Sequence, residues 1–199
     1  QVVDDAEQAV LAAAAQPGPV VLKALGVDRL GKVEAQGLAL DLNDEDEVRA
    51  AYARMAEHLG DRMHPALVQA MVPPGADVLV DLHQHPRWGS TVSLGVGGAV
   101  ALALDDRVQR VVPLTDLDAG RLVDASPVQR VLDDCGPIAD RTRLEELVLR
   151  VSALADLLPE VARLRLNPVI VGPDVAWITA AWGKVRPWTP GPDPGLRRL

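Results

Sequence analysis

Apolar residues in the first third of the chain recur at the spacings of both helices and strands. Val48, Tyr52 and Met55 lie three or four residues apart, which places their side chains on one face of a helix. That helix begins at an acidic N-cap, Asp44 or Asp46, because a carboxylate accepts hydrogen bonds from the first free backbone N–H groups. The pattern predicts helices over 4–16 and from this cap to 59, and strands over 19–23, 38–42 and 66–72.

The rest of the chain, after the turn-forming Pro73-Pro74-Gly75, alternates in the same irregular way. An apolar stripe marks the longest expected helix, with Leu144, Leu147, Val148, Val151, Leu154 and Leu158 on one side. The pattern predicts strands over 76–82, 91–94, 99–104, 164–171 and 175–181, a loop over 83–89, and helices over 116–123 and 141–158.

This irregular alternation predicts an α/β (α+β) protein of two lobes, each a mixed or antiparallel sheet with flanking helices. We expect a smaller lobe over 1–66, incomplete at its N-terminal end, and a larger lobe over 67–186. The segment 187–199 is rich in Pro and Gly, which is typical of a tail or a linker.

Composition narrows the classes of function. The chain has 199 residues, with 20 Lys and Arg against 28 Asp and Glu, and a formal net charge of −8. We expect no nucleic-acid partner, because such affinity depends on clustered cations. No apolar run reaches the length of a membrane span and Cys135 stands alone, so we expect no membrane association and a cytoplasmic location.

Two features could bind phosphate. Lys23 ends an apolar strand and Lys32 follows in a loop, so either could direct a cation at a phosphate, although a plain surface lysine is the simpler interpretation. Gly95-Val96-Gly97-Gly98 could expose backbone N–H groups to a phosphate, or could be a glycine bulge between strands.

Metal-dependent and nucleophilic chemistry has weaker support. His83 and His85 form a His-x-His pair near Asp81, which suits zinc only with further ligands, and a polar loop is the simpler interpretation. Ser90 lacks the surroundings of a hydrolase nucleophile, and two aspartates before Cys135 disfavour its thiolate.

The order of these segments resembles the ATP-grasp domain of the NDP-forming acyl-CoA synthetases, the relatives of the succinyl-CoA synthetase nucleotide-binding subunit. The resemblance covers nearly the whole chain. Two further segments, 113–119 and 157–162, look most like fusion proteins in which such a module is joined to a GNAT acyltransferase domain. The segments that carry the main resemblance are 19–23, 32–37, 68–72, Trp88-Gly89, 94–98, 110–114 and 164–168.

The resemblance implies a nucleotide site for ATP or ADP with Mg. Lys23 and Lys32 would contact phosphates, and Gln69, Ala70 and Met71 would form the hinge that meets adenine. Asp77 would lie on the ribose side of the nucleotide. Gly97 and Gly98 would form the phosphate loop, and Asn167 would be a metal ligand.

Other positions depart from the family's pattern. Leu102 and Arg165 stand where the resemblance expects metal-binding acids, so only Asn167 remains of that set. Gly31 replaces a histidine and Thr179 an aspartate. Because an arginine repels the magnesium ion that phosphoryl transfer requires, the four losses together favour a domain that no longer performs ATP-dependent ligation.

The leading hypothesis is therefore a degenerate ATP-grasp domain, a pseudoenzyme that senses a nucleotide or a CoA thioester and regulates an attached acyltransferase. The alternative is a working nucleotide-binding subunit of an ADP-forming acyl-CoA synthetase that recruits other acids, such as Asp105 or Asp106. A pure interaction module is the third interpretation. Expected partners are a CoA-binding synthetase domain or a GNAT domain, in the same polypeptide or in a partner subunit.

Overall fold

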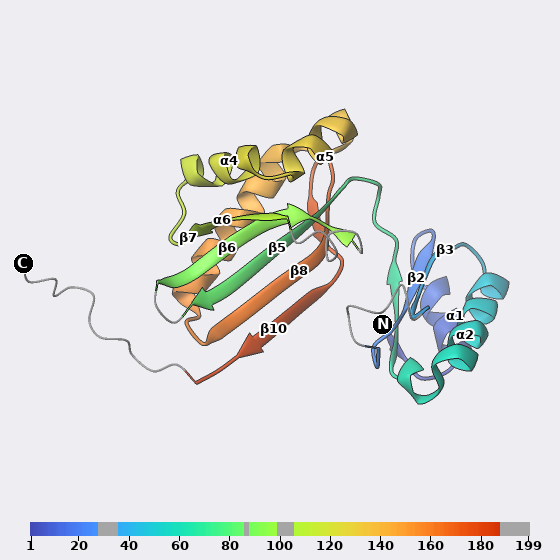
Figure 1. The fold of residues 1–199 in the computed structure, drawn as a ribbon. Helices are drawn as coiled ribbons and strands as arrows, with labels where there is room; N and C mark the ends of the chain where they lie inside the picture. The colour runs from blue at the N-terminus through green and yellow to red at the C-terminus, as the bar shows by residue number, and fades with distance from the viewer. Residues whose placement is uncertain (28–35, 86–87, 99–105, 188–199) are drawn as a thin grey trace, which may run out of the picture. The chain divides into compact units, whose positions relative to one another are not determined.

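The computed structural model describes residues 1–27, 36–85, 88–98 and 106–187, and it divides the chain into two compact units (Figure 1). Unit 1 is Gln1–Pro73 and unit 2 is Pro74–Leu199. The boundary lies later than the expected end of the smaller lobe at residue 66. The reason is that the strand at Ala66–Ala70 pairs with two strands of unit 1 and so belongs to its sheet.

Unit 1 is a four-stranded antiparallel sheet of order β1-β4-β2-β3, with the helices α1 and α2 in its described part. Asp5 and Asp44 cap the two helices, because their side chains accept hydrogen bonds from backbone N–H groups three residues on; at the second helix this is the first of the two expected caps. Its elements are β1 (Val2–Val3), α1 (Ala6–Ala14), β2 (Val20–Ala24), β3 (Leu38–Leu42), α2 (Glu45–Leu59), the 3-10 turn η2 (Gly60–Met63) and β4 (Ala66–Ala70).

The core of unit 1 forms between the sheet and its helices. Val48, Tyr52 and Met55, the stripe predicted for the second helix, are each less than 10% exposed and belong to this core. They pack in one cluster with strand residues such as Leu22 and Val68, which have no exposed surface. Unit 1 thus has a hydrophobic core of its own.

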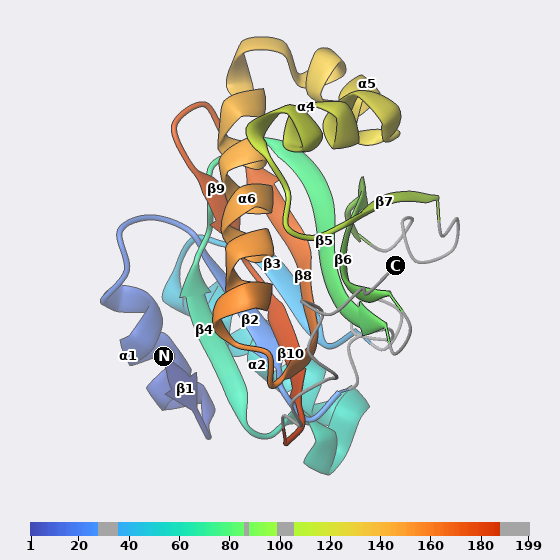
Figure 2. The ribbon, with the colours of Figure 1, turned by 90° about the vertical axis from the view of Figure 1, so that its left-hand side faces the viewer.

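Unit 2 is a six-stranded sheet of order β10-β8-β5-β6-β7, with β9 also paired to β8, and every pair is antiparallel. Figures 1 and 2 show α4, α5 and α6 on the same side of this sheet. Its elements are β5 (Ala76–His85), β6 (Gly89–Val96), β7 (Arg107–Val111), α4 (Asp116–Ala125), α5 (Val128–Cys135), the 3-10 turn η3 (Gly136–Ile138), α6 (Arg141–Leu157), β8 (Val161–Val171), β9 (Ala176–Ile178) and β10 (Ala181–Val185).

Strand alternation divides the side chains of this sheet between two faces. Val80, Leu82 and Leu94 point to the helices and are fully buried in the core of unit 2, together with Leu144 and Val148 of α6. Residues at the intervening strand positions point the other way, to a face that these helices do not cover. We call it the helix-free face.

Some elements differ from the sequence-based expectations. His83, Gln84 and His85 were expected in a loop, but they continue β5 and pair with β6 through residues 89–91. The helix α5 and the strand β7 were not expected. The strand expected over 99–104 lies outside the described residues.

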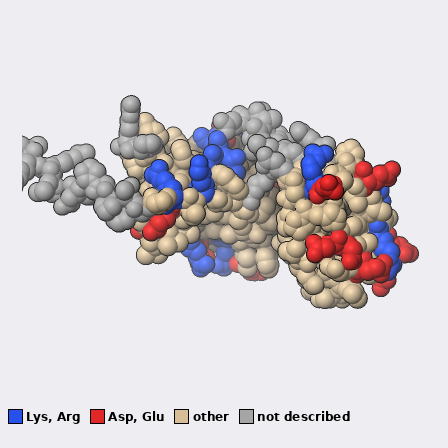
Figure 3. Space-filling model, turned by 90° about the horizontal axis from the view of Figure 1, so that it is seen from below, with Lys and Arg blue, Asp and Glu red and all other residues tan. Residues whose placement is uncertain are grey.

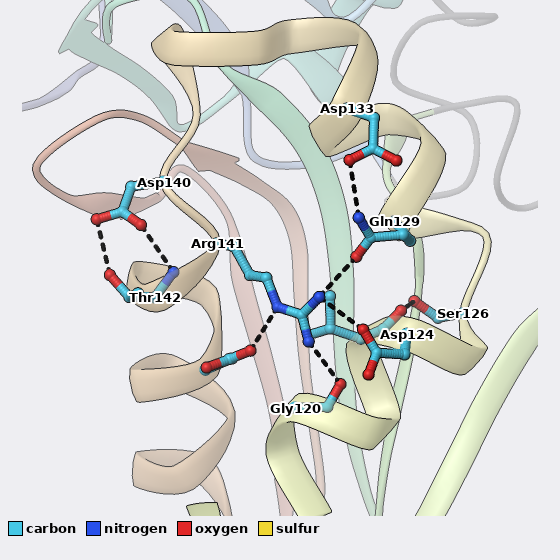
Figure 4. A network of polar contacts seen from close by, with 10 residues as sticks. Gly120, Asp124, Ser126, Gln129, Asp133, Asp140, Arg141 and Thr142 are labelled. Carbon is cyan, nitrogen blue, oxygen red and sulfur yellow. Dashed lines mark hydrogen bonds and ion pairs between the residues drawn. The ribbon is translucent and has the colours of Figure 1, made fainter. Parts of the chain in front are cut away.

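The guanidinium of Arg141 ties α4, α5 and α6 together at one end (Figure 4). Arg141 lies at the first turn of α6 and donates from Nε to Glu145, from Nη1 to Asp124 and Gln129, and from Nη2 to the Gly120 carbonyl, at 2.6 to 2.9 Å. Hydrogen bonds with these carboxylates raise the pKa of Arg141, so the side chain stays charged.

We predict that Arg141→Gln lowers the free energy of unfolding by about 1 to 2 kcal/mol, because the shorter neutral amide cannot reach both α4 and α5. Urea denaturation would measure the change. Arg150→Gln is the matched control, since its side chain is 75% exposed and pairs only within α6; its effect should stay within about 0.5 kcal/mol. Equal losses in the two variants would contradict the proposed role of Arg141.

Candidate functional site

The candidate residues of unit 1 lie on β2 and β4, which are neighbours in its sheet. Lys23 of β2 donates from Nζ to Oε1 of Gln69 on β4 at 2.9 Å. Ala70 is paired with Val20 in the ladder, and the backbone N–H of Met71 donates to the carbonyl of Pro19 at 2.9 Å. The structure therefore brings Lys23 and Gln69 together, whereas Lys32 lies outside the described residues.

The candidate residues of unit 2 meet where β5 begins and β6 ends. The N–H of Gly97 donates to the carbonyl of Asp77 at 2.8 Å, and the N–H of Gly98 donates to Oδ1 of Asn167 at 3.1 Å. Four residues that the sequence singled out, Asp77, Gly97, Gly98 and Asn167, thus form one cluster. Both glycines already donate their N–H groups within it.

Gly97 is required by the close approach of Asp77. A Cβ atom at Gly97 would lie 1.8 Å from Oδ1 of Asp77 and 2.7 Å from the backbone nitrogen of Val78. Gly98 has a φ of 74°, in the left-handed region that favours glycine. Gly97 therefore permits close packing and Gly98 permits a turn. These two requirements hold whether or not the glycines also bind a ligand.

Asp77 has an unusual environment. Oδ1 of this carboxylate is buried and has no hydrogen-bond partner among the described residues. Burial raises the pKa of Asp77 to about 6, because removal from water disfavours the charged form.

The structure also shows a cluster that the sequence motifs do not indicate. Asp81 of β5 is 2% exposed and accepts hydrogen bonds from three guanidinium groups, those of Arg107, Arg163 and Arg165. Burial alone would raise the pKa of Asp81, but the bonds from Arg163 and Arg165 hold it below its usual value. The signal was present in the sequence, because Arg163 and Arg165 lie two residues apart and so share one face of a strand.

Two of the positions at which this chain departs from the family's pattern lie in or beside this sheet. Arg165 donates from Nη2 to Oδ2 of Asp81 at 2.6 Å, and Thr179 lies between β9 and β10 with its hydroxyl bonded to the carbonyl of Pro168. Gly31, Leu102 and Asp105 lie outside the described residues, and Asp106 is exposed just before β7.

The described residues show no ready-made cluster of metal ligands. No three His, Cys, Asp or Glu side chains of the described ranges lie together to hold a metal, although magnesium bound with a nucleotide needs only one or two carboxylates beside the phosphate oxygens. His83 and His85 are neighbours on β5, and the ring of His85 stacks on Trp88 with 3.7 Å between centroids. Asn167, the expected metal ligand, directs Oδ1 to Gly98.

Charge is divided unevenly between the units. Unit 1 has 12 Asp and Glu against six Lys and Arg, and unit 2 has 16 against 14. Figure 3 shows acidic side chains prominent on unit 1 and several basic groups on unit 2.

No helix within the described ranges combines the length and apolar character that crossing a bilayer requires.

Residues 1–182 match the sequence profile of the ATP-grasp domain. The chain belongs to this family, and its sheets with flanking helices agree with the expected fold. It is homologous to ADP-forming acetyl-CoA synthetases.

Two relatives define the relationship. Acetate--CoA ligase [ADP-forming] I of Archaeoglobus fulgidus is 31% identical over 159 residues, which are 77% of this chain and 23% of that protein. The beta subunit of Acetate--CoA ligase [ADP-forming] I of Pyrococcus furiosus is 26% identical, over 79% of this chain and 71% of the subunit. The chain thus spans about a quarter of the former protein's length.

Solved structures agree with these sequence matches. The dinucleotide forming acetyl-coenzyme A synthetase 1 of Ca. Korarchaeum cryptofilum, in complex with coenzyme A and Ca-AMPCP, matches with a TM-score of 0.83 and 27% identity, over 94% of this chain and 84% of that chain. A second structure of that protein holds coenzyme A and Mg-AMPPCP, and matches with a TM-score of 0.76 and 28% identity, over the same shares of the two chains.

We predict that Gly97→Ala destabilises unit 2 by about 1 to 3 kcal/mol, because the added methyl group would overlap Asp77 and the Val78 backbone. Gly183→Ala in β10 is the control. Its Cβ would meet nothing closer than 3.7 Å, so a change within about 0.5 kcal/mol is expected. Denaturant unfolding of both variants would test the packing, which would be refuted if Gly97→Ala were as stable as the control.

A second prediction concerns pH. The pKa of Asp77 is about 6 in the folded state and 3.8 when unperturbed, so ionisation of this buried group lowers stability as the pH rises through this window. Asp77→Asn should therefore be more stable than the wild type at pH 8. The gain should be about 1 to 2 kcal/mol, less than the full pKa difference implies, because solvent reaches part of the carboxylate. The difference should vanish near pH 4.

The free energies of unfolding of the wild type and of Asp77→Asn, measured between pH 4 and 8, would test this prediction. Asp174→Asn, in an exposed turn, should show no such pH-dependent gain. A stability difference for Asp77→Asn that is independent of pH would rule out the titration of Asp77 as its cause.

Proposed function

We propose that this ATP-grasp domain binds an adenine nucleotide or a CoA thioester as a regulatory ligand and no longer catalyses ADP-forming acyl-CoA synthesis. One observation carries the proposal. Arg165 stands where the resemblance expects a metal-binding acid, and its guanidinium is fixed on Asp81 at 2.6 Å. A cation at that place opposes a magnesium ion, on which phosphoryl transfer depends.

Ligand binding itself retains support. Lys23 lies beside Gln69 on the sheet of unit 1, where the resemblance implies contacts with phosphate and adenine. Asp77, Gly97 and Gly98 lie together in unit 2, on the side implied for ribose and phosphate. A domain can therefore keep groups that recognise a nucleotide after it has lost groups that hold the metal.

The setting of the domain forms part of the proposal. The relatives include both multi-domain synthetases and separate beta subunits, so a CoA-binding synthetase domain is a fitting partner, in the same polypeptide or as another subunit. Regulation of a GNAT acyltransferase domain fits the segments 113–119 and 157–162. In either case we place the domain in the cytoplasm.

The second candidate is a working nucleotide-binding subunit of an ADP-forming acyl-CoA synthetase. The observation in its favour is the match to the separate Pyrococcus furiosus beta subunit, of which the aligned region covers 71%. In this case other acids, such as Asp105 or Asp106, would supply the metal ligands.

Thermal unfolding with ATP, ADP or acetyl-CoA, each in MgCl2 and in EDTA, separates these proposals. A ligand that binds only the folded state at 100 times its Kd adds about 2.7 kcal/mol of stability, which raises Tm by several degrees. For a regulatory domain we expect a Tm increase with at least one ligand that is equal in MgCl2 and EDTA. Lys23→Ala should reduce the increase caused by a nucleotide, whereas the exposed Arg54→Ala should not.

Two results would contradict this proposal. An ATP-induced increase that requires magnesium and disappears in Lys23→Ala would support the synthetase subunit instead. No increase with any of the three ligands would leave a pure interaction module as the function.

A further inference from the structure

Unit 1 has a pocket of about 140 Å³ beside its helices α1 and α2, where β2 begins and β3 ends. Its floor consists of Val10 of α1, Val20 of β2, Leu42 of β3 and Val48 of α2, each less than 10% exposed. Four elements thus meet here without filling the space between them. Because protein interiors contain few voids larger than a water molecule, this hollow is a candidate site for a small ligand.

The volume of the pocket limits the group that fits. A cavity of about 150 Å³ with apolar walls stays dry and holds one benzene molecule. The pocket of unit 1 is similar in size, but its rim is open to solvent, since Gly18 and Asn43 line it and are exposed. A ligand that buries one apolar group of about benzene size and keeps a polar end at the rim therefore fits.

The rim carries the carboxylates that begin α2. Asp44, the N-cap, accepts the N–H of Glu47 at Oδ1, at 2.8 Å. Oε2 of Glu45 lies 3.5 Å from Nη1 of Arg49, which bonds more closely to Glu7, at 2.9 and 3.1 Å. Within the described part of the chain, Oδ2 of Asp44 and Oε1 of Glu45 have no hydrogen-bond partner, so both can accept from a ligand.

The C-terminal end of α1 also lies at the pocket. Ala13 and Ala14, the last two residues of this helix, line it. The carbonyl groups at the end of a helix carry partial negative charge, and the last turn of α1 has no basic residue to balance it. The partial positive charge at the start of α2 is offset by three acidic residues in its first turn. The pocket therefore combines an apolar floor with a negative rim.

We propose that this pocket binds a small organic cation, an amine with an apolar group of about the size of a benzene ring. The apolar group contacts the four floor residues, and the ammonium group donates hydrogen bonds to Asp44 and Glu45. Charge complementarity favours this ligand over a neutral or anionic one, because unit 1 has 12 Asp and Glu against six Lys and Arg. The site lies within unit 1 and its ligand is opposite in charge to a nucleotide, so the inference does not depend on the proposed function.

The experiment is an NMR titration of the methyl-labelled full chain with benzylammonium chloride. We expect the methyl resonances of Val10, Val20, Leu42 and Val48 to shift, with a Kd in the millimolar range that is typical of so small a ligand. The resonances of Leu11, which is exposed on α1 and does not line the pocket, should not shift. Benzyl alcohol and benzoate carry the same ring without the positive charge. We expect benzyl alcohol to bind at least tenfold more weakly and benzoate not to bind.

Variants of the rim and of the pocket volume test the two parts of the site. Asp44→Asn keeps an N-cap and removes a charge, and it should raise the Kd about threefold, as should Glu45→Gln. Asp46→Asn changes the same turn outside the pocket lining and should leave the Kd unchanged. Ala14→Leu puts a larger side chain at the pocket and should raise the Kd at least tenfold, whereas Ala50→Leu, at an exposed position of α2, should not.

Three results would overturn the site, and the wild-type titrations decide it even where a variant fails to fold. The first is the absence of shifts at the floor residues, and the second is an affinity for benzyl alcohol or benzoate equal to that for benzylammonium. The third is an equal increase of the Kd in Asp46→Asn and Glu45→Gln. A nucleotide that raises Tm while benzylammonium does not bind would leave the proposed function standing and this inference refuted.

Discussion

A buried carboxylate must be compensated, and Asp81 imposes this requirement on the middle of the larger sheet. With 2% of its surface exposed, it stays ionised because guanidinium groups replace the water it has lost. Residues on the neighbouring strands meet this requirement. Arg163 and Arg165 occupy the adjacent strand, and Gly95 leaves the gap through which Arg107 arrives from two strands away. Removing the carboxylate would leave like charges crowded on one face.

This arrangement bears directly on what the domain can bind. No three His, Cys, Asp or Glu side chains of the described residues lie together to hold a metal, and an arginine stands where the resemblance expects a metal-binding acid. The family membership and the solved relatives with nucleotide analogues nevertheless fit a ligand with phosphate groups.

The sequence predicted the elements whose patterns are local. The stripe of Val48, Tyr52 and Met55 and the acidic cap at Asp44 were sufficient for α2, because helix periodicity and capping depend on neighbours within a few residues. The helix α5 was missed, since its eight residues include only a short apolar pattern, and His83 and His85 continue a strand through pairing with β6. Strand extension depends on a partner that local patterns do not reveal.

The candidate site was predictable from the glycine run and from the positions that the resemblance supplied. Together they singled out Asp77, Gly97, Gly98 and Asn167, which the structure brings together. They did not indicate the arginine partners of Asp81, which lie 26 to 84 residues away in the sequence. Periodicity could place Arg163 and Arg165 on one face but could not say which strand would lie beside them. Register, which pairs Asp81 with Arg165, is a property of the folded sheet.

The two faces of this sheet also separate two kinds of evolutionary constraint. Positions such as Val80, Leu82 and Leu166 keep the helices packed, so substitutions there are limited by volume. The alternating positions, including Asp81 and Arg165, lie outside that hydrophobic cluster, so substitutions there are limited by charge and hydrogen bonding instead of by volume. Each strand of this sheet therefore meets two separate requirements, and a change that satisfies one of them leaves the other to be satisfied independently.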